Sequence, residues 1–219
     1  MVRVDTIPQQ IKTLATHHHF TNEGTLPDIP EYLLGATATE KVYVIARITE
    51  EYGISDSYIT EMIHPGPYAK IISQMFKDAV HEAIMIEADE HSGEFHTRTY
   101  PDDLGSIDTY LSIQTNIDEL VEGLSETAQF YYETEDVEKS VAINDSLDNH
   151  REYIFGDLTV VDQMYLIEET ANQYEIKSVQ ESGQFPAMVN GRWEDVIQHG
   201  MLWSHLAAVI EAKVNFEQS

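Results

Sequence analysis

The acidic residues of this chain are spread evenly along it, beside an apolar content that is normal for a folded protein. Residues 1–125 contain 21 Asp and Glu against 7 Lys and Arg, and residues 126–219 contain 18 against 5, a net charge of −27. An acidic tail would concentrate this charge, and a disordered acidic chain would lack aromatic and β-branched residues. With 42% hydrophobic residues, including 12 Tyr and 7 Phe, the chain can bury a core. We therefore expect a folded protein whose whole surface is acidic.

Such a surface repels itself at ordinary ionic strength, whereas molar salt shortens the screening length to about 3 Å. Few Lys, many Asp and Glu and no Cys together resemble the composition of proteins from salt-in haloarchaea and their viruses. The abundant Ile departs from that composition, because haloarchaeal genomes usually encode Val or Ala instead. We predict a halophilic protein. A nucleic-acid-mimicking inhibitor is the alternative that also needs dense negative charge.

The same composition argues against several classes of protein. Binding to nucleic acid relies on Lys and Arg to neutralise phosphates, and no segment here clusters more than two bases. No apolar run approaches the roughly 20 residues that span a bilayer, and the first residues are too polar for a signal peptide. The absence of Cys excludes disulfides and thiolate metal sites. We expect no sequence-specific nucleic-acid binding and no membrane, and an intracellular protein or a particle assembled in the high-salt cytoplasm of a host cell.

The pattern of residues 1–125 predicts a mainly helical part. Its clearest helix begins at Thr37, because Thr37 and Glu40 have the spacing of a capping box. Gly53 has the place of the residue that ends such a helix in the left-handed conformation. The caps therefore define a helix over residues 37–53.

Longer apolar periodicity follows. A helix is predicted from Pro67, which suits a first helical position, to about Glu90. Residues 95–100 alternate and indicate a strand, and residues 106–124 return to a helical spacing.

In residues 126–219 the spacing between apolar residues shortens toward two. This alternation predicts a mainly antiparallel β part, a small barrel or sandwich. Asn190-Gly191 between apolar flanks is a strong hairpin signal. The last stretch, residues 201–216, suits a helix at its start and a strand at its end. The predicted fold class is therefore α+β, a helical part over 1–125 and a mainly β part over 126–219. The alternating stretches begin at Ala128, Tyr153, Val161 and Tyr174.

One cluster of His and carboxylate residues, within residues 81–96, is a candidate metal site. Glu87 and His91 are four apart and share a face of the predicted helix, which suits a carboxylate–imidazole metal pair. His96 could supply a third ligand from the following strand. The cluster lacks the His-Glu-x-x-His pattern of zinc peptidases and the paired Glu-x-x-His of di-iron bundles. A solvated acidic helix end is the alternative. We otherwise expect no catalytic residues and no cofactor.

The stretch from Gly156-Asp-Leu-Thr-Val-Val-Asp162 to Tyr174-Glu-Ile-Lys-Ser-Val-Gln-Glu-Ser-Gly183 resembles the strand–turn–strand rhythm of tailed-phage neck proteins. In those head-closure or head–tail connector proteins the rhythm belongs to a small β-barrel. The helical first part is more similar to an adaptor that docks on a portal. The resemblance implies a ring-forming virion protein with no catalytic residues.

We therefore expect a non-enzymatic structural protein of a haloarchaeal tailed virus, in the neck, the head–tail connector or the tail. Its expected partners are further copies of itself in a ring and other virion proteins, such as portal or tail proteins. Two alternatives come from other classes. One is a metal-dependent enzyme of a halophile that uses the cluster at residues 81–96, and the other is a cellular protein-binding module.

Overall fold

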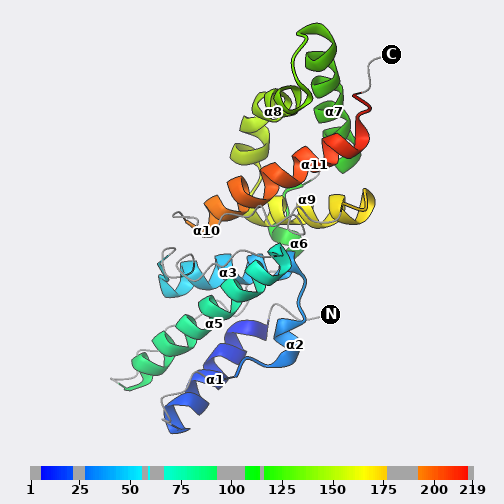
Figure 1. The fold of residues 1–219 in the computed structure, drawn as a ribbon. Helices are drawn as coiled ribbons and strands as arrows, with labels where there is room; N and C mark the ends of the chain where they lie inside the picture. The colour runs from blue at the N-terminus through cyan, green and yellow to red at the C-terminus, as the bar shows by residue number, and fades with distance from the viewer. Residues whose placement is uncertain are drawn as a thin grey trace. The chain divides into compact units, whose positions relative to one another are not determined.

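The computed structural model describes residues 6–21, 28–55, 59, 67–92, 107–113, 116–176 and 192–216. Every regular element in these ranges is a helix (Figure 1). Residue contacts divide the chain into two compact units. The first comprises Met1–His64, Ala69–Tyr110 and Asn190–Trp193, and the second comprises Pro65–Tyr68, Leu111–Val189 and Glu194–Ser219.

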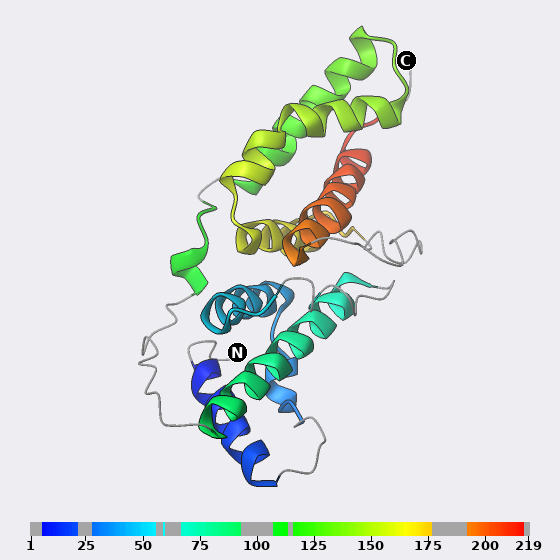
Figure 2. The same cartoon turned by 90° about the vertical axis from the view of Figure 1, so that its left-hand side faces the viewer.

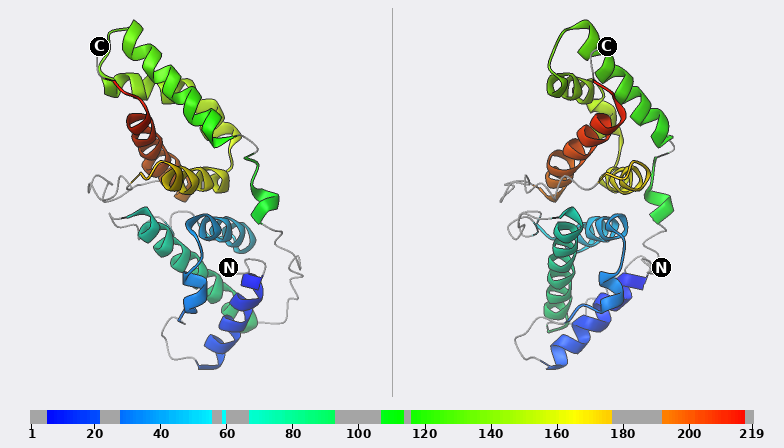
Figure 3. Two further views of the ribbon diagram at one scale, coloured as in Figure 1. Left: turned by 90° about the vertical axis from the view of Figure 1, so that its right-hand side faces the viewer. Right: turned by 45° about the vertical axis from the view of Figure 1, so that its right-hand side comes forward.

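The first unit contains α1 (Ile7–Thr21), α2 (Glu31–Leu34), α3 (Ala38–Tyr52), most of α5 (Tyr68–Ser92) and α6 (Ile107–Tyr110) (Figure 3). α3 and α5 supply most of its core, because each buries apolar residues three and four apart. Lys41 of α3 is also buried, and its ammonium group donates to the Ser73 hydroxyl of α5 at 3.0 Å. The buried apolar residues of the two helices include Val42, Ile45, Ile48, Ile72, Met75, Phe76, Ala79, Val80 and Ala83.

The two helices that the sequence defined most sharply are confirmed. Thr37 caps α3, since its hydroxyl accepts from the Glu40 backbone N–H at 3.1 Å and the Thr37 N–H donates to the Glu40 carboxylate at 2.8 Å. Gly53 follows the helix at φ 61°, the left-handed conformation that favours glycine. α5 begins directly after Pro67 and continues to Ser92.

The second unit contains α7 (Ile117–Thr134), α8 (Lys139–Asn149), the π-helical segment η2 (Tyr153–Asp157), α9 (Val160–Gln173), the π-helical segment η4 (Val196–Leu202) and α11 (Trp203–Lys213). The short α10 (Trp193–Asp195) precedes η4. α7 and α8 form an antiparallel pair, visible in Figure 2. The buried Ser146 hydroxyl of α8 donates to the Leu124 carbonyl of α7 at 2.6 Å. This bond requires close approach of the two helices.

The predicted α+β fold is wrong, because the described residues of 126–219 form helices and no strand. The apparent alternation arose because apolar residues two apart in the sequence lie on different faces of the same helix. In α7, for example, the buried face is Val121, Leu124 and Ala128, while Phe130 lies 59% exposed on another face. The other alternating stretches belong to η2 and α9 or follow α9 directly.

Of four further sequence predictions, two differ in part from the structure and two lie outside the described residues. The helix predicted over 106–124 is split into α6 and α7, and α7 then runs past residue 125 to Thr134. In the ambiguous stretch 201–216, α11 continues to Lys213 and residues 214–216 are not helical. The strand predicted over 95–100 and the Asn190-Gly191 hairpin lie outside the described residues.

The residues that carried the resemblance to neck proteins are mostly helical where they are described, and none of the described ones is in a strand. Gly156 and Asp157 end η2, and the residues from Val160 to Gln173 form α9. The first strand of the expected strand–turn–strand pattern is therefore wrong, whereas residues 177–183 lie outside the described residues. Among the described helices, none is long and apolar enough to cross a membrane.

Candidate functional site

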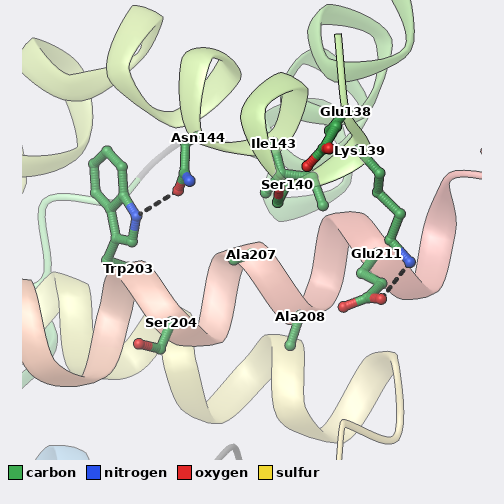
Figure 4. A pocket seen from close by; sticks show the side chains of 10 residues that line it. All are labelled: Glu138, Lys139, Ser140, Ile143, Asn144, Trp203, Ser204, Ala207, Ala208 and Glu211. Atoms are coloured by element: carbon green, nitrogen blue, oxygen red, sulfur yellow. Dashed lines mark hydrogen bonds and ion pairs between the residues drawn. The ribbon is translucent and has the colours of Figure 1, made fainter. Parts of the chain in front are cut away.

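A groove of about 600 Å³ lies between α8 and α11 within the second unit (Figure 4). Lys139 and Glu211 meet at one end, and Asn144 and Trp203 meet at the other, so the two helices run antiparallel along it. From Trp203 to Glu211 the groove follows α11 for about 12 Å, or roughly two helical turns. Between these ends the groove is lined by Ser140 and Ile143 of α8 and by Ser204, Ala207 and Ala208 of α11, and all of these except Ile143 are small.

Trp203 forms a wall of the groove, and its indole is held from three sides. Its Nε1–H donates to Asn144 Oδ1 at 3.2 Å. Its ring stacks on Phe155 at 5.7 Å between centroids and 17° between planes. The Arg151 guanidinium lies 5.8 Å from the Trp203 ring centroid, within cation–π range. These three contacts restrain the orientation of the Trp203 side chain in the unbound protein.

Both π-helical segments contribute to this wall. Phe155 belongs to η2, and Trp203 directly follows η4. His199 of η4 covers Phe155 at 5.7 Å and 25°. π-helical turns are rare in proteins and often occur at functional sites, because they reposition side chains relative to a regular helix. Here they align three rings beside the end of the groove.

The unit that contains the groove is rich in acidic residues. Residues 111–176 and 194–216 of the second unit contain 19 Asp and Glu and only three Lys and Arg. Two carboxylates, Glu138 and Glu211, line the groove itself. Each of the three bases is already bound to a carboxylate of the same unit, in the pairs Lys139–Glu211, Arg151–Asp148 and Lys213–Glu122.

No protein family, curated protein or solved structure matches this chain significantly.

The predicted metal ligands are placed only in part. Glu87 lies in α5, is 3% exposed, and accepts a hydrogen bond from the Tyr52 hydroxyl at 3.1 Å. This contact joins α5 to α3 within the core of the first unit. His91 lies in the last turn of α5, but its side chain and the whole of His96 lie outside the described residues. The three-ligand site stays a prediction. Within the ranges that are described, no three His, Asp or Glu side chains form a cluster that could bind a metal.

Asp162 is a buried carboxylate that the sequence analysis did not single out. Its side chain is fully buried at the first turn of α9. It accepts from the Thr159 backbone N–H at 3.0 Å and from the Thr159 hydroxyl at 2.6 Å. It also accepts from the backbone N–H groups of Ser112 and Ile113, at 2.6 and 3.2 Å, and from the Ser112 hydroxyl. One carboxylate therefore caps α9 and fastens the segment that precedes α7.

His205 is fully buried in α11. Its Nε2 lies 2.7 Å from the Thr170 hydroxyl, which itself donates to the Leu166 carbonyl at 2.6 Å. Nε2 therefore carries the proton and donates to Thr170. Nδ1 is buried without a hydrogen-bond partner among the described residues. Burial lowers the pKa of His205 from 6.5 to about 4, so the imidazole is neutral at pH 7 and serves the core.

Proposed function

We propose that this chain is a non-enzymatic assembly protein that binds other proteins in a high-salt environment, as a structural component of a haloarchaeal virus particle. In this proposal it binds further copies of itself in a ring and other virion proteins, such as portal or tail proteins. The single observation that carries the binding function is the groove between α8 and α11 with its fixed Trp203 wall.

Two properties of the groove support protein binding. Trp and Arg are common among the residues that dominate binding energy, especially where they are held in place beside small apolar residues. Pre-organisation also lowers the entropy cost of association. Both properties meet at Trp203, which is restrained by Asn144, Phe155 and Arg151.

The high-salt part of the proposal rests on the evenly distributed acidic residues. The helices even place carboxylates next to one another, since Asp118, Glu122 and Glu126 follow at intervals of four along α7. Like charges at this spacing destabilise a helix by about 0.2–0.5 kcal/mol per pair. Salt screens such repulsion.

We therefore expect the free energy of unfolding to increase by about 0.4–1 kcal/mol from these two pairs when KCl is raised from about 0.1 M to about 1 M, because the screening length falls from about 10 Å to about 3 Å. Urea unfolding monitored by circular dichroism measures the change. Glu126→Lys is the matched variant, and its gain from salt should be smaller because one repulsive row is broken. A stability that stays constant or falls with salt would contradict the halophilic assignment.

The ring is tested separately by light scattering of the full chain in about 1 M KCl, where repulsion between acidic copies is screened. We expect a mass that is a whole-number multiple of the chain mass, greater than two, across micromolar concentrations. A monomer at every concentration would refute the ring, but it would leave binding to other proteins in place.

The alternative of a metal-dependent enzyme gains no specific support from the described residues. The Glu87 carboxylate is buried and bound to Tyr52, which is a structural use of the group. Metal analysis of untagged protein tests the prediction directly.

A further inference from the structure

We propose that the groove between α8 and α11 binds an amphipathic α-helix of a different protein, with a narrow apolar face and Lys or Arg residues on its flanks. This inference rests on the proposed binding function and names the chemistry of the partner.

The shape of the groove favours a helix. α8 and α11 run antiparallel beside each other, so a third helix can lie along both, as in helix-in-groove recognition. The lining residues Ala207 and Ser204 are small and half-buried, which lets a helix approach to the usual separation of about 8–10 Å between axes. The groove follows α11 for about 12 Å. Three apolar side chains at positions i, i+4 and i+7 of a partner would occupy that length.

The two ends of the groove are polar and define where the apolar face of the partner ends. Trp203 and its hydrogen bond to Asn144 close one end. The ion pair between Lys139 and Glu211 closes the other. A partner helix with more than about two turns of apolar residues would bury one of these polar groups at a cost.

The charge of the unit favours basic flanks on the partner. Over residues 111–176 and 194–216 the 19 acidic residues outnumber the three bases, and these three bases are bound to carboxylates of the same unit. A cationic flank would therefore meet Glu138 and the surrounding carboxylates without displacing an existing base. A second copy of this acidic chain would bring like charge to the same face, which costs binding energy at about 0.1 M salt and less at about 1 M, where the repulsion is screened.

The probe is a fluorescein-labelled peptide of about 20 residues, long enough to be partly helical in isolation, with Leu at three positions of one face and Lys on both flanks. A second peptide carries Glu in place of every Lys, and a third has the Leu positions scrambled. Fluorescence anisotropy with the full chain, in about 0.1 M and about 1 M KCl, gives the affinities. We expect the Lys peptide to bind more tightly than both others, with a smaller advantage over the Glu peptide at high salt.

Variants of the chain locate the site. Ala207→Leu enlarges a lining side chain and should weaken binding at least about tenfold, as should Trp203→Ala, which removes the wall. Ala171→Leu makes the same change on α9, away from the groove, and should leave the affinity unchanged. Glu138→Lys should weaken binding of the Lys peptide at low salt, whereas Glu126→Lys on α7 should do so less. Circular dichroism checks the fold of each variant, and Ala207→Leu keeps the test valid if Trp203→Ala unfolds.

Three outcomes would overturn the inference. The first is equal binding to wild type and Ala207→Leu, which would place the peptide elsewhere. The second is equal affinity for the Lys and Glu peptides at low salt, which would refute the basic flanks. In the third, the groove variants lower the oligomeric mass of the chain, which would make a second copy the occupant. Failure of the peptide to bind a chain that still forms a ring would refute this inference and leave the ring intact.

Discussion

Replacing Asp162 with alanine is expected to destabilise the protein by about 3–5 kcal/mol. The change removes a buried carboxylate acceptor and leaves several hydrogen-bond donors without their partner. The Asp162 carboxylate receives hydrogen bonds from two N–H groups of residues 112–113 and from the N–H and hydroxyl of Thr159. The alanine side chain offers these donors no acceptor. A loss of this size is a large fraction of the 5–15 kcal/mol that stabilises a typical protein.

Urea unfolding of Asp162→Ala in about 1 M KCl measures the loss. Asp157→Ala is the matched control, since Asp157 is an exposed carboxylate at the end of η2 and should change stability by less than about 0.5 kcal/mol. Thr159→Ala should fall between them at about 1 kcal/mol, because it removes the two contacts of the Thr159 hydroxyl with Asp162 and leaves the contacts with residues 112–113. Equal stability of Asp162→Ala and Asp157→Ala would show that the carboxylate does not fasten this region.

Stability is expected to fall steeply as the pH drops through the range governed by His205. The folded-state pKa of His205 is about 4, against 6.5 for the unconstrained side chain. Above pH 6.5 the imidazole is neutral in both states and adds no pH dependence. Between pH 6.5 and 4 His205 is protonated in the unfolded chain but stays neutral in the folded protein. The free energy of unfolding therefore decreases with falling pH. The full loss is about 3 kcal/mol, reached below pH 4, and about 2 kcal/mol is lost by pH 5.

The structural reason is the position of the two ring nitrogens. Nε2 already donates to Thr170, and a proton on Nδ1 would be buried without an acceptor in the described surroundings. His205→Gln should therefore flatten the stability profile between pH 6.5 and 5, while lowering stability at pH 7 through altered packing. His199→Gln is the control, because His199 is exposed and should leave the slope as it is. Parallel urea titrations at pH 7.5, 6 and 5 compare the slopes, and identical slopes for wild type and His205→Gln would refute the assignment.

The helices that could be predicted from the sequence are those with both a cap and a long periodic face. α3 has the capping box of Thr37 and Glu40 and the terminal Gly53, and α5 has 25 residues over which the helical period repeats. Local chemistry and tertiary packing agree there, so the sequence pattern carried the information.

The second half was mispredicted because its helices are short and their buried faces contain polar and small residues. α8 buries Ala142, Ile143, Ser146 and Leu147 over only 11 residues. Ser146 is a polar residue on this buried face, and its hydroxyl is satisfied by a carbonyl of α7. The cap of α9 was readable, since Thr159 and Asp162 have capping-box spacing. It differed from the usual form in using Asp in place of Glu.

The groove could not be predicted from the sequence. The positions Ser204, Ala207, Ala208 and Glu211 share one face only once residues 203–213 are known to be helical. The π-helical turns that align Phe155 with Trp203 leave no recognised sequence signal. Their effect on side-chain direction is a property of the folded backbone.

The scarcity of bases among the described residues of the second unit has a practical consequence for capturing its partners. Reagents that join two amines would find few sites there, since Lys139 and Lys213 are the lysines of these residues and form ion pairs with Glu211 and Glu122. A carbodiimide joins a carboxylate directly to a lysine amine without a spacer. It would therefore react with the carboxylates, which are abundant in this unit. Glu138 at the groove would then form an amide with a lysine of the bound helix. Mass spectrometry of that linkage would identify both the partner and the residue that faces the groove.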